Sequence, residues 1–158
     1  MKIRSDFVTN SSSSSFILGF KNEDTIQDEL EKGFPSWEMK YHFDRVLDDI
    51  NSEPKFNKDE LKLKLKDALY YTARWEVGRN YLKRNINHTY ATWYDYMDTE
   101  EGRAEIEAYK DKIISDVLNQ AEDKDIFVEI EYDDHCNGHL EHEIMPKVAN
   151  VIYTISHH

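Results

Sequence analysis

Residues 16–20, Phe-Ile-Leu-Gly-Phe, are the stretch that decides the fold. This apolar run is too short for a helix, so we expect a buried strand. Near the other end of the chain, residues 126–132 follow a two-residue period that places Ile, Val, Ile and Tyr on one face, as in a strand. Residues 150–156 are rich in Val, Ile, Tyr and Thr and predict a third strand. The predicted strands therefore come from both ends of the chain.

The middle of the chain carries four helical patterns. Helix start signals occur at Asn22, Ser36, Asn57 and Asp98, and each is followed by apolar residues at three- and four-residue spacing. Together with the terminal strands, these patterns predict an α+β fold with a small sheet from both chain ends, covered on one face by about four helices. A chain of 158 residues fits one domain, so we expect a single domain over residues 1–158.

Composition limits the classes of function. Hydrophobic residues at 39% and aromatic residues at 13% predict a packed core rather than disorder. A formal net charge of −12 argues against general binding to nucleic acid or anionic membranes, which requires a basic surface. One cysteine, Cys136, excludes an internal disulfide and favours a cytoplasmic protein, and no stretch approaches the roughly 18 apolar residues of a membrane span.

A serine-rich run near the start offers the first candidate site. Its hydroxyl and backbone N–H groups could hold a phosphate or a carboxylate, although phosphate loops usually contain glycine and this run has none. One serine could instead be a nucleophile if a histidine acts as its base, or the run could be a flexible linker. The candidate ligand-binding residues are Asn10, Ser11, Ser12, Ser13, Ser14 and Ser15.

Residues 133–143, Asp-Asp-His-Cys-Asn-Gly-His-Leu-Glu-His-Glu, combine the residue types that bind metals or transfer protons. If residues 139–145 are helical, His139 and His142 share a face and could bind one divalent ion, with His158 as a further ligand. The candidate catalytic residues are Glu141, His142 and His157. The alternative is a solvated loop, because the spacing matches no established metal motif.

Both ends also carry a resemblance. The start, Met-Lys-Ile-Arg-Ser-Asp-Phe-Val-Thr-Asn followed by five serines and Phe16, with the pair Glu141-His142 and the ending Ser-His-His, resembles a group of uncharacterised proteins of bacteria and their phages. These share a Phe-Val-Ser/Thr-Asn-polyserine-Phe signature. The resemblance implies a setting in a phage or mobile element, and it implies no particular chemistry.

The sequence thus favours a phage- or mobile-element-associated accessory protein that binds an anionic or phosphorylated ligand at the serine run and the C-terminal histidines. Such a site could hydrolyse the ligand or transfer its phosphoryl group, and whether the protein is an enzyme stays open. The alternative is a non-enzymatic, acidic counter-defence protein that binds a host protein, with nucleic-acid mimicry as one mode. Arginines between residues 74 and 84 lie among aromatics, but arginine on such helices usually meets carboxylates, so direct nucleic-acid binding is not expected.

Overall fold

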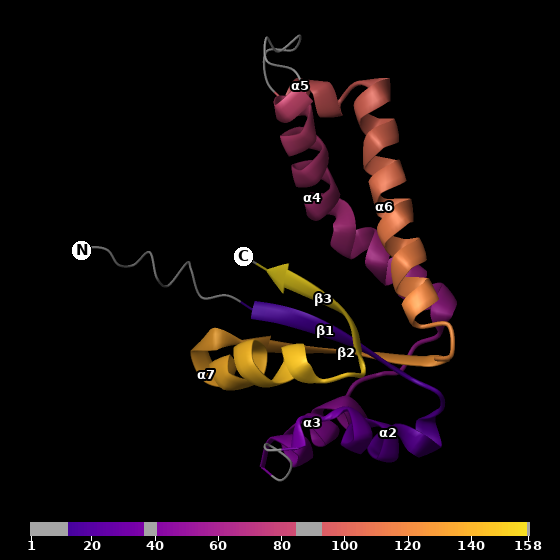
Figure 1. Ribbon diagram of the computed structural model, residues 1–158, viewed down its shortest axis with the longest axis vertical. Coiled ribbons are helices and arrows are strands. Elements are labelled where there is room, and N and C mark those ends of the chain that lie inside the picture. The colour runs from indigo at the N-terminus through magenta and orange to yellow at the C-terminus, as the bar shows by residue number, and fades with distance from the viewer. Residues whose placement is uncertain (1–12, 37–40, 85–92, 158) are drawn as a thin grey trace, which may run out of the picture. The chain divides into compact units, whose positions relative to one another are not determined.

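The computed structural model describes residues 13–36, 41–84 and 93–157. The chain divides into two compact units, one formed by Met1–Lys58 with Gln120–His158 and one formed by Asp59–Asn119. The first unit contains the sheet (Figure 1), and the second is helical. The single domain expected over residues 1–158 stays a prediction.

A three-stranded antiparallel sheet is built from the two ends of the chain, as the sequence predicts. The order is β2-β1-β3, with β1 (Ser13–Phe20) between β2 (Ile126–Asp133) and β3 (Val151–His157). Ser13 pairs with Asp133 on one side and with His157 on the other. Ser13 and His157 therefore lie at the same end of the sheet.

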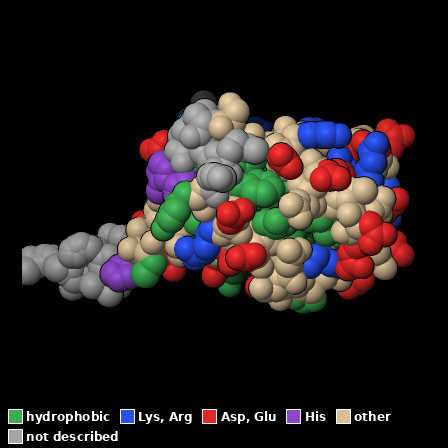
Figure 2. Space-filling view, turned by 90° about the horizontal axis from the view of Figure 1, so that it is seen from below, with side chains coloured by type: hydrophobic (Ala, Val, Ile, Leu, Met, Phe, Trp, Pro, Cys, Tyr) green, Lys and Arg blue, Asp and Glu red, His purple; other side chains and the backbone are tan. Residues whose placement is uncertain are grey.

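One face of the sheet is covered by helices of the same unit. These are α2 (Ile26–Gly33), α3 (Tyr41–Ser52) and the helical connection from β2 to β3, and α2, α3 and α7 lie on one side of the sheet in Figure 1. Their buried side chains meet those of the strands, and burying one large apolar side chain contributes about 1.5–3 kcal/mol. The core consists of Phe16, Leu18, Phe20, Ile26, Leu30, Phe34, Phe43, Val46, Ile50, Val128, Ile130, Tyr132, Leu140, Ile144, Met145 and Val148. Outside this core, acidic and basic side chains are interspersed on the face shown in Figure 2.

The connection from β2 to β3 is helical, although the pair Asn137-Gly138 in its sequence predicts a turn. It consists of α7 (Asp134–His139), the π-helix η3 (Leu140–Ile144) and the 3-10 helix η4 (Met145–Lys147). Asp133 starts α7, since its carboxylate accepts a hydrogen bond from the backbone N–H of Cys136 at 2.8 Å. The helix α7 is kinked at this pair, because Asn137 has a non-helical backbone with φ −132° and ψ 31°.

The second unit is built from α4 (Lys58–Arg84), α5 (Trp93–Met97) and α6 (Glu100–Gln120). Of the four predicted helices, two thus cover the sheet and the other two belong to this unit. Its core includes Ala73, Val77, Tyr81, Tyr96, Met97 and Ile106. Among the helices of the described ranges, none has the length and apolar character needed to cross a bilayer.

Ion pairing joins the ends of the helices in this unit. Arg84 at the end of α4 lies 2.8 Å from Glu105 of α6, and Tyr96 of α5 donates a hydrogen bond to the same carboxylate. Burial alone would raise the pKa of Glu105, but the hydrogen bonds from Arg84 and Tyr96 outweigh it, so the pKa is lowered overall.

Candidate functional site

The described serines occupy the first positions of β1, and their side chains alternate between the two faces of the sheet. Ser14 shares a face with Phe16 and the helix-covered core, whereas Ser13 and Ser15 face the opposite way. Asn10, Ser11, Ser12 and His158 lie outside the described residues. The site expected from the sequence is therefore divided between the two faces.

On the helix-covered face, Ser14 meets a buried carboxylate. Its hydroxyl donates a hydrogen bond of 2.8 Å to Oε1 of Glu141, although the two residues are 127 positions apart in sequence. Only 2% of Glu141 is exposed. The other carboxylate oxygen, Oε2, is buried and accepts no hydrogen bond from the described residues. A buried carboxylate oxygen of this kind is costly unless a donor or a cation compensates it.

Two further side chains converge on Glu141. Nε2 of His142 lies 3.3 Å from Oε2 of Glu141, close enough for an ion pair when the imidazole is protonated but without the geometry of a hydrogen bond. Asp134, the first residue of α7, completes the group: one ligand atom each from Asp134, Glu141 and His142 lie within 4.8 Å of one another. Asp134 and His142 are exposed, so the group is open to solvent on one side.

The opposite face carries a second cluster at the same end of the sheet. The Oγ atom of Ser15 lies 2.9 Å from Nε2 of His157, and Oε2 of Glu131 lies 3.5 Å from that same nitrogen. In a Ser-His-carboxylate triad the carboxylate holds the other ring nitrogen, and the serine must reach a substrate. Here both partners meet one nitrogen and Ser15 is 3% exposed, so the geometry does not favour a nucleophilic serine.

His139 lies apart from the converging group. Its ring packs against that of His42 with centroids 4.9 Å apart, beside a cavity of about 360 Å³ that Tyr41, Arg45 and Cys136 also line. The prediction that His139 and His142 bind one ion requires a regular helix over both residues. The chain instead changes from α7 to the π-helix η3 between them. Among the described residues, His142 lies close to Asp134 and Glu141, and the shared ion of His139 and His142 stays a prediction.

Asp134 was not among the predicted metal ligands. Its only sequence signal is its place directly after a predicted strand, eight positions before His142, and no known motif has that spacing. Its neighbour Asp133 has the same chemistry but caps α7. The sequence alone does not distinguish these two roles.

Tyr132 lies opposite Ser14 in the sheet and closes this side of the core. Its hydroxyl donates a hydrogen bond of 2.6 Å to Asp49, which also pairs with Arg45 at 3.2 Å. Burial, and then the hydrogen bond to Asp49, raise the pKa of the Tyr132 phenol far above its usual value. The phenol is therefore a fixed donor and is not available as a proton-transfer group near neutral pH.

The arginines of α4 are engaged with neighbouring groups. Arg79 binds Glu76 at 2.8 Å, Arg84 binds Glu105, and Arg74 lies over the ring of Tyr70 at 5.5 Å. Such contacts are the ordinary role of arginine on a helix surface.

Comparisons with protein-family models, with curated proteins and with solved structures found no match for this chain.

Proposed function

We propose that this protein binds a divalent cation through Asp134, Glu141 and His142, and that the cation holds an anionic, phosphorylated ligand at the end of the sheet. The observation that carries the proposal is the buried Oε2 atom of Glu141, which accepts no hydrogen bond in the described part of the chain. A cation would compensate this oxygen, and the two exposed ligands would hold the cation at the surface with positions open for a ligand.

The donor set indicates which metals suit the site. Two carboxylates and one imidazole are the ligands of Mn²⁺ and Zn²⁺ rather than of soft metals, which prefer thiolates. Ser14 orients Glu141 by donating to its other oxygen, as groups behind metal ligands commonly do. The cation would attract the phosphate that the acidic side chains alone would repel.

Hydrolysis or phosphoryl transfer is the reaction class that such a site serves when a bound cation activates water or polarises a phosphate. The setting in a phage or mobile element is part of the proposal and is supported by the resemblance of the two chain ends.

Titration of untagged protein with Mn²⁺, followed by electron paramagnetic resonance, tests the cation site. We expect one bound ion per chain and at least a tenfold weaker affinity in Glu141→Gln, because this change removes the buried negative ligand. His139→Ala and His157→Ala are matched controls that remove imidazoles outside the group and should bind like the unaltered protein. Equal affinity in Glu141→Gln and the unaltered protein, or loss of binding in His139→Ala alone, would contradict the assignment.

A second candidate is a non-enzymatic protein that binds a basic host protein. The observation favouring it is an exposed aromatic area on the helical unit, where Tyr71 is 81%, Trp75 58% and Tyr94 57% exposed. With a net charge of −12, its binding to a basic partner should weaken as salt rises. Binding to a purified basic partner that persists unchanged after charge reversal of the acidic residues between 98 and 107 would argue against nucleic-acid mimicry.

A further inference from the structure

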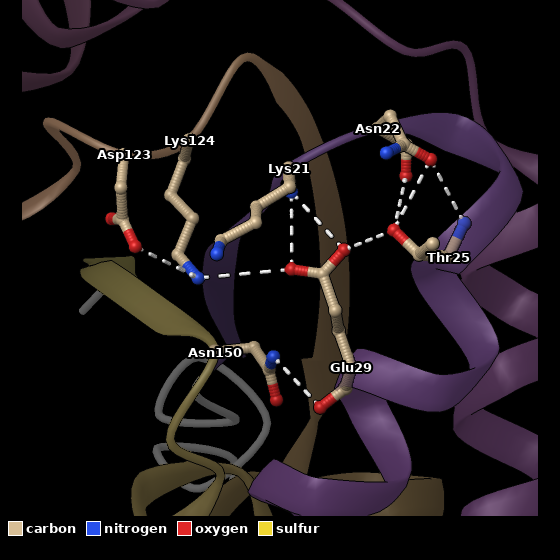
Figure 3. Close-up of polar contacts among 7 residues, drawn as sticks. All are labelled: Lys21, Asn22, Thr25, Glu29, Asp123, Lys124 and Asn150. Atoms are coloured by element: carbon tan, nitrogen blue, oxygen red, sulfur yellow. Dashed lines mark hydrogen bonds and ion pairs between the residues drawn. The ribbon is translucent and has the colours of Figure 1, made fainter.

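A polar cavity of about 590 Å³ lies at the other end of the sheet, within the first unit. Its walls come from the residues that follow β1, from α2, and from the residues that precede β2 and β3 (Figure 3). The volume lies in the usual range for small-molecule sites, about 300–1,000 Å³. The lining includes three lysines, Lys21, Lys32 and Lys124, and three carboxylates, Asp28, Glu29 and Asp123.

Glu29 forms most of the polar contacts that hold the wall of this cavity together. Its carboxylate accepts hydrogen bonds from the backbone N–H of Lys21 at 3.0 and 3.1 Å and from the hydroxyl of Thr25 at 2.6 Å, and it pairs with Lys124 at 3.7 Å (Figure 3). These bonds tie the residues after β1, α2 and the turn before β2 together. Both oxygens of Glu29 and the ammonium of Lys124 are thereby engaged, so the wall is held in place by contacts within the protein.

Asn150 supplies a buried acceptor to the same cavity. It is 8% exposed, and its Nδ2 atom donates a hydrogen bond of 3.2 Å to the backbone oxygen of Glu29. Its Oδ1 atom is buried and receives no hydrogen bond from the residues described. The side chain fits because residue 33 is glycine: a Cβ atom there would lie 2.0 Å from Oδ1. A ligand hydroxyl that donates a hydrogen bond to Oδ1 would satisfy this oxygen.

Two cations of the lining form no ion pair with any acidic residue in the described part of the chain. The side chains of Lys21 and Lys32 are exposed at the rim, and neither ammonium forms an ion pair with a carboxylate of the described residues. Lysine ammonium groups are common phosphate binders. The lining residues within the described ranges include no aromatic ring and no large apolar side chain, which a nucleobase would need for stacking.

We propose that this cavity binds a small phosphorylated polyol or sugar, with the phosphate at Lys21 and Lys32 and a hydroxyl donating to Oδ1 of Asn150. A simple anion would use the lysines but would leave Asn150 without a donor. A neutral sugar would satisfy Asn150 but would leave the two ammonium groups without an anion. A ligand with both a phosphate and hydroxyl groups would provide an anion for the two lysines and a donor for Asn150.

The cavity is separate from the proposed cation site. It is lined by residues that follow β1 and precede β2 and β3, whereas Ser14 and Asp134 lie at the opposite end of the sheet. With a rise of about 3.3 Å per residue, the eight residues of β1 separate the two ends by about 23 Å. The two proposals can therefore fail independently.

Nuclear magnetic resonance titration of the 18.8 kDa chain tests the inference. The probes are glycerol 3-phosphate, ribose 5-phosphate and glucose 6-phosphate, with inorganic phosphate and glucose as the two partial ligands. We expect at least one sugar or polyol phosphate to bind ten times more tightly than either partial ligand. The largest shifts should occur at the side-chain amide of Asn150 and at the backbone amides of Lys21 and Gly33.

Paired lysine variants provide the control. The double variant Lys21→Ala, Lys32→Ala should weaken binding at least tenfold, whereas Lys62→Ala, Lys66→Ala on α4 makes the same change in charge outside the cavity and should leave binding unchanged. All four lysines are exposed, so neither change should disturb folding. Glu141→Gln should also leave sugar-phosphate binding intact.

Three results would overturn the inference. One is the absence of binding for all three phosphorylated probes, and another is an equal affinity for inorganic phosphate. The third is an equal loss of affinity in the two double-lysine variants, which would indicate attraction by overall charge rather than binding in the cavity.

Discussion

Ser14 is the residue that links the start of the chain to the proposed cation site. Its hydroxyl is the only described donor to the carboxylate of Glu141, and it comes from a strand that lies 127 residues earlier. A buried carboxylate with one hydrogen bond is poorly compensated, so the contribution of this single donor should be measurable.

Ser14→Ala should lower the free energy of unfolding by about 1–3 kcal/mol, because it leaves Oε1 of Glu141 buried without its donor. Ser13→Ala is the matched control, since Ser13 lies on the opposite face of the sheet and should change stability by less than about 0.5 kcal/mol. Urea denaturation of the metal-free variants at pH 7 measures both. Equal effects of the two changes would show that the bond to Glu141 does not matter.

Tyr132 makes a pH-dependent contribution to stability. Its pKa is raised in the folded state by burial and by Asp49. The phenol of the unfolded chain loses its proton at about pH 10, whereas the phenol of the folded chain keeps it. The contribution of Tyr132 to stability is therefore complete below this pH and falls as the pH rises further.

Tyr132→Phe should therefore cost about 1–2 kcal/mol at pH 7, where the hydrogen bond to Asp49 is intact, and progressively less above about pH 10. Urea midpoints at pH 7, 9 and 10.5 follow the difference between variant and unaltered protein. Tyr71→Phe serves as the control, since 81% of that side chain is exposed, and it should leave the pH profile unchanged. A difference for Tyr132→Phe that is constant over this pH range would contradict the explanation.

At the level of elements, two helical glycines have opposite surroundings. A Cβ atom at Gly102 of α6 would lie 2.2 Å from the backbone oxygen of Tyr96 and 2.8 Å from the Cα atom of Met97. At Gly138 of α7 the nearest atom would be 3.9 Å away, an ordinary contact. The first position needs glycine so that α5 and α6 can approach each other, and the second does not.

Gly102→Ala should destabilise the protein by about 1–3 kcal/mol, because backbone atoms must move to accommodate the methyl group. Gly138→Ala should instead stabilise it by up to about 1 kcal/mol, since alanine has the higher helix propensity. Thermal denaturation followed by circular dichroism compares the two. A stabilising Gly102→Ala would show that the α5 to α6 junction adapts easily.

The elements themselves were largely predictable from the sequence. The apolar run at residues 16–20 and the alternation at residues 126–132 predict β1 and β2, and cap signals predict the middle helices. A helix over residues 139–145 enters the sequence analysis only as a condition for a shared ion, and Asn137-Gly138 signals a turn, so the helical connection over residues 134–147 is not predicted. Capping by Asp133 and packing of Leu140 and Ile144 into the core outweigh that local signal.

For the whole molecule, the pairing of the two chain ends was predicted, but the division of the site was not. Composition alone identifies Glu141, His142 and the serines as candidates, whereas the face that each serine occupies depends on the register of β1. A shift by one residue would place Ser15 rather than Ser14 beside Glu141. The polar cavity at Asn150 has no motif at all, because its lining residues come together only in the folded chain.

We propose that the fold brings Asp134, Glu141 and His142 together as one cation site. The most direct test is anomalous scattering from crystals of untagged protein grown with Mn²⁺. We expect a peak about 2.0–2.3 Å from a carboxylate oxygen of Asp134, from Oε2 of Glu141 and from a ring nitrogen of His142. Ordered side chains at these three residues with no peak between them would contradict it.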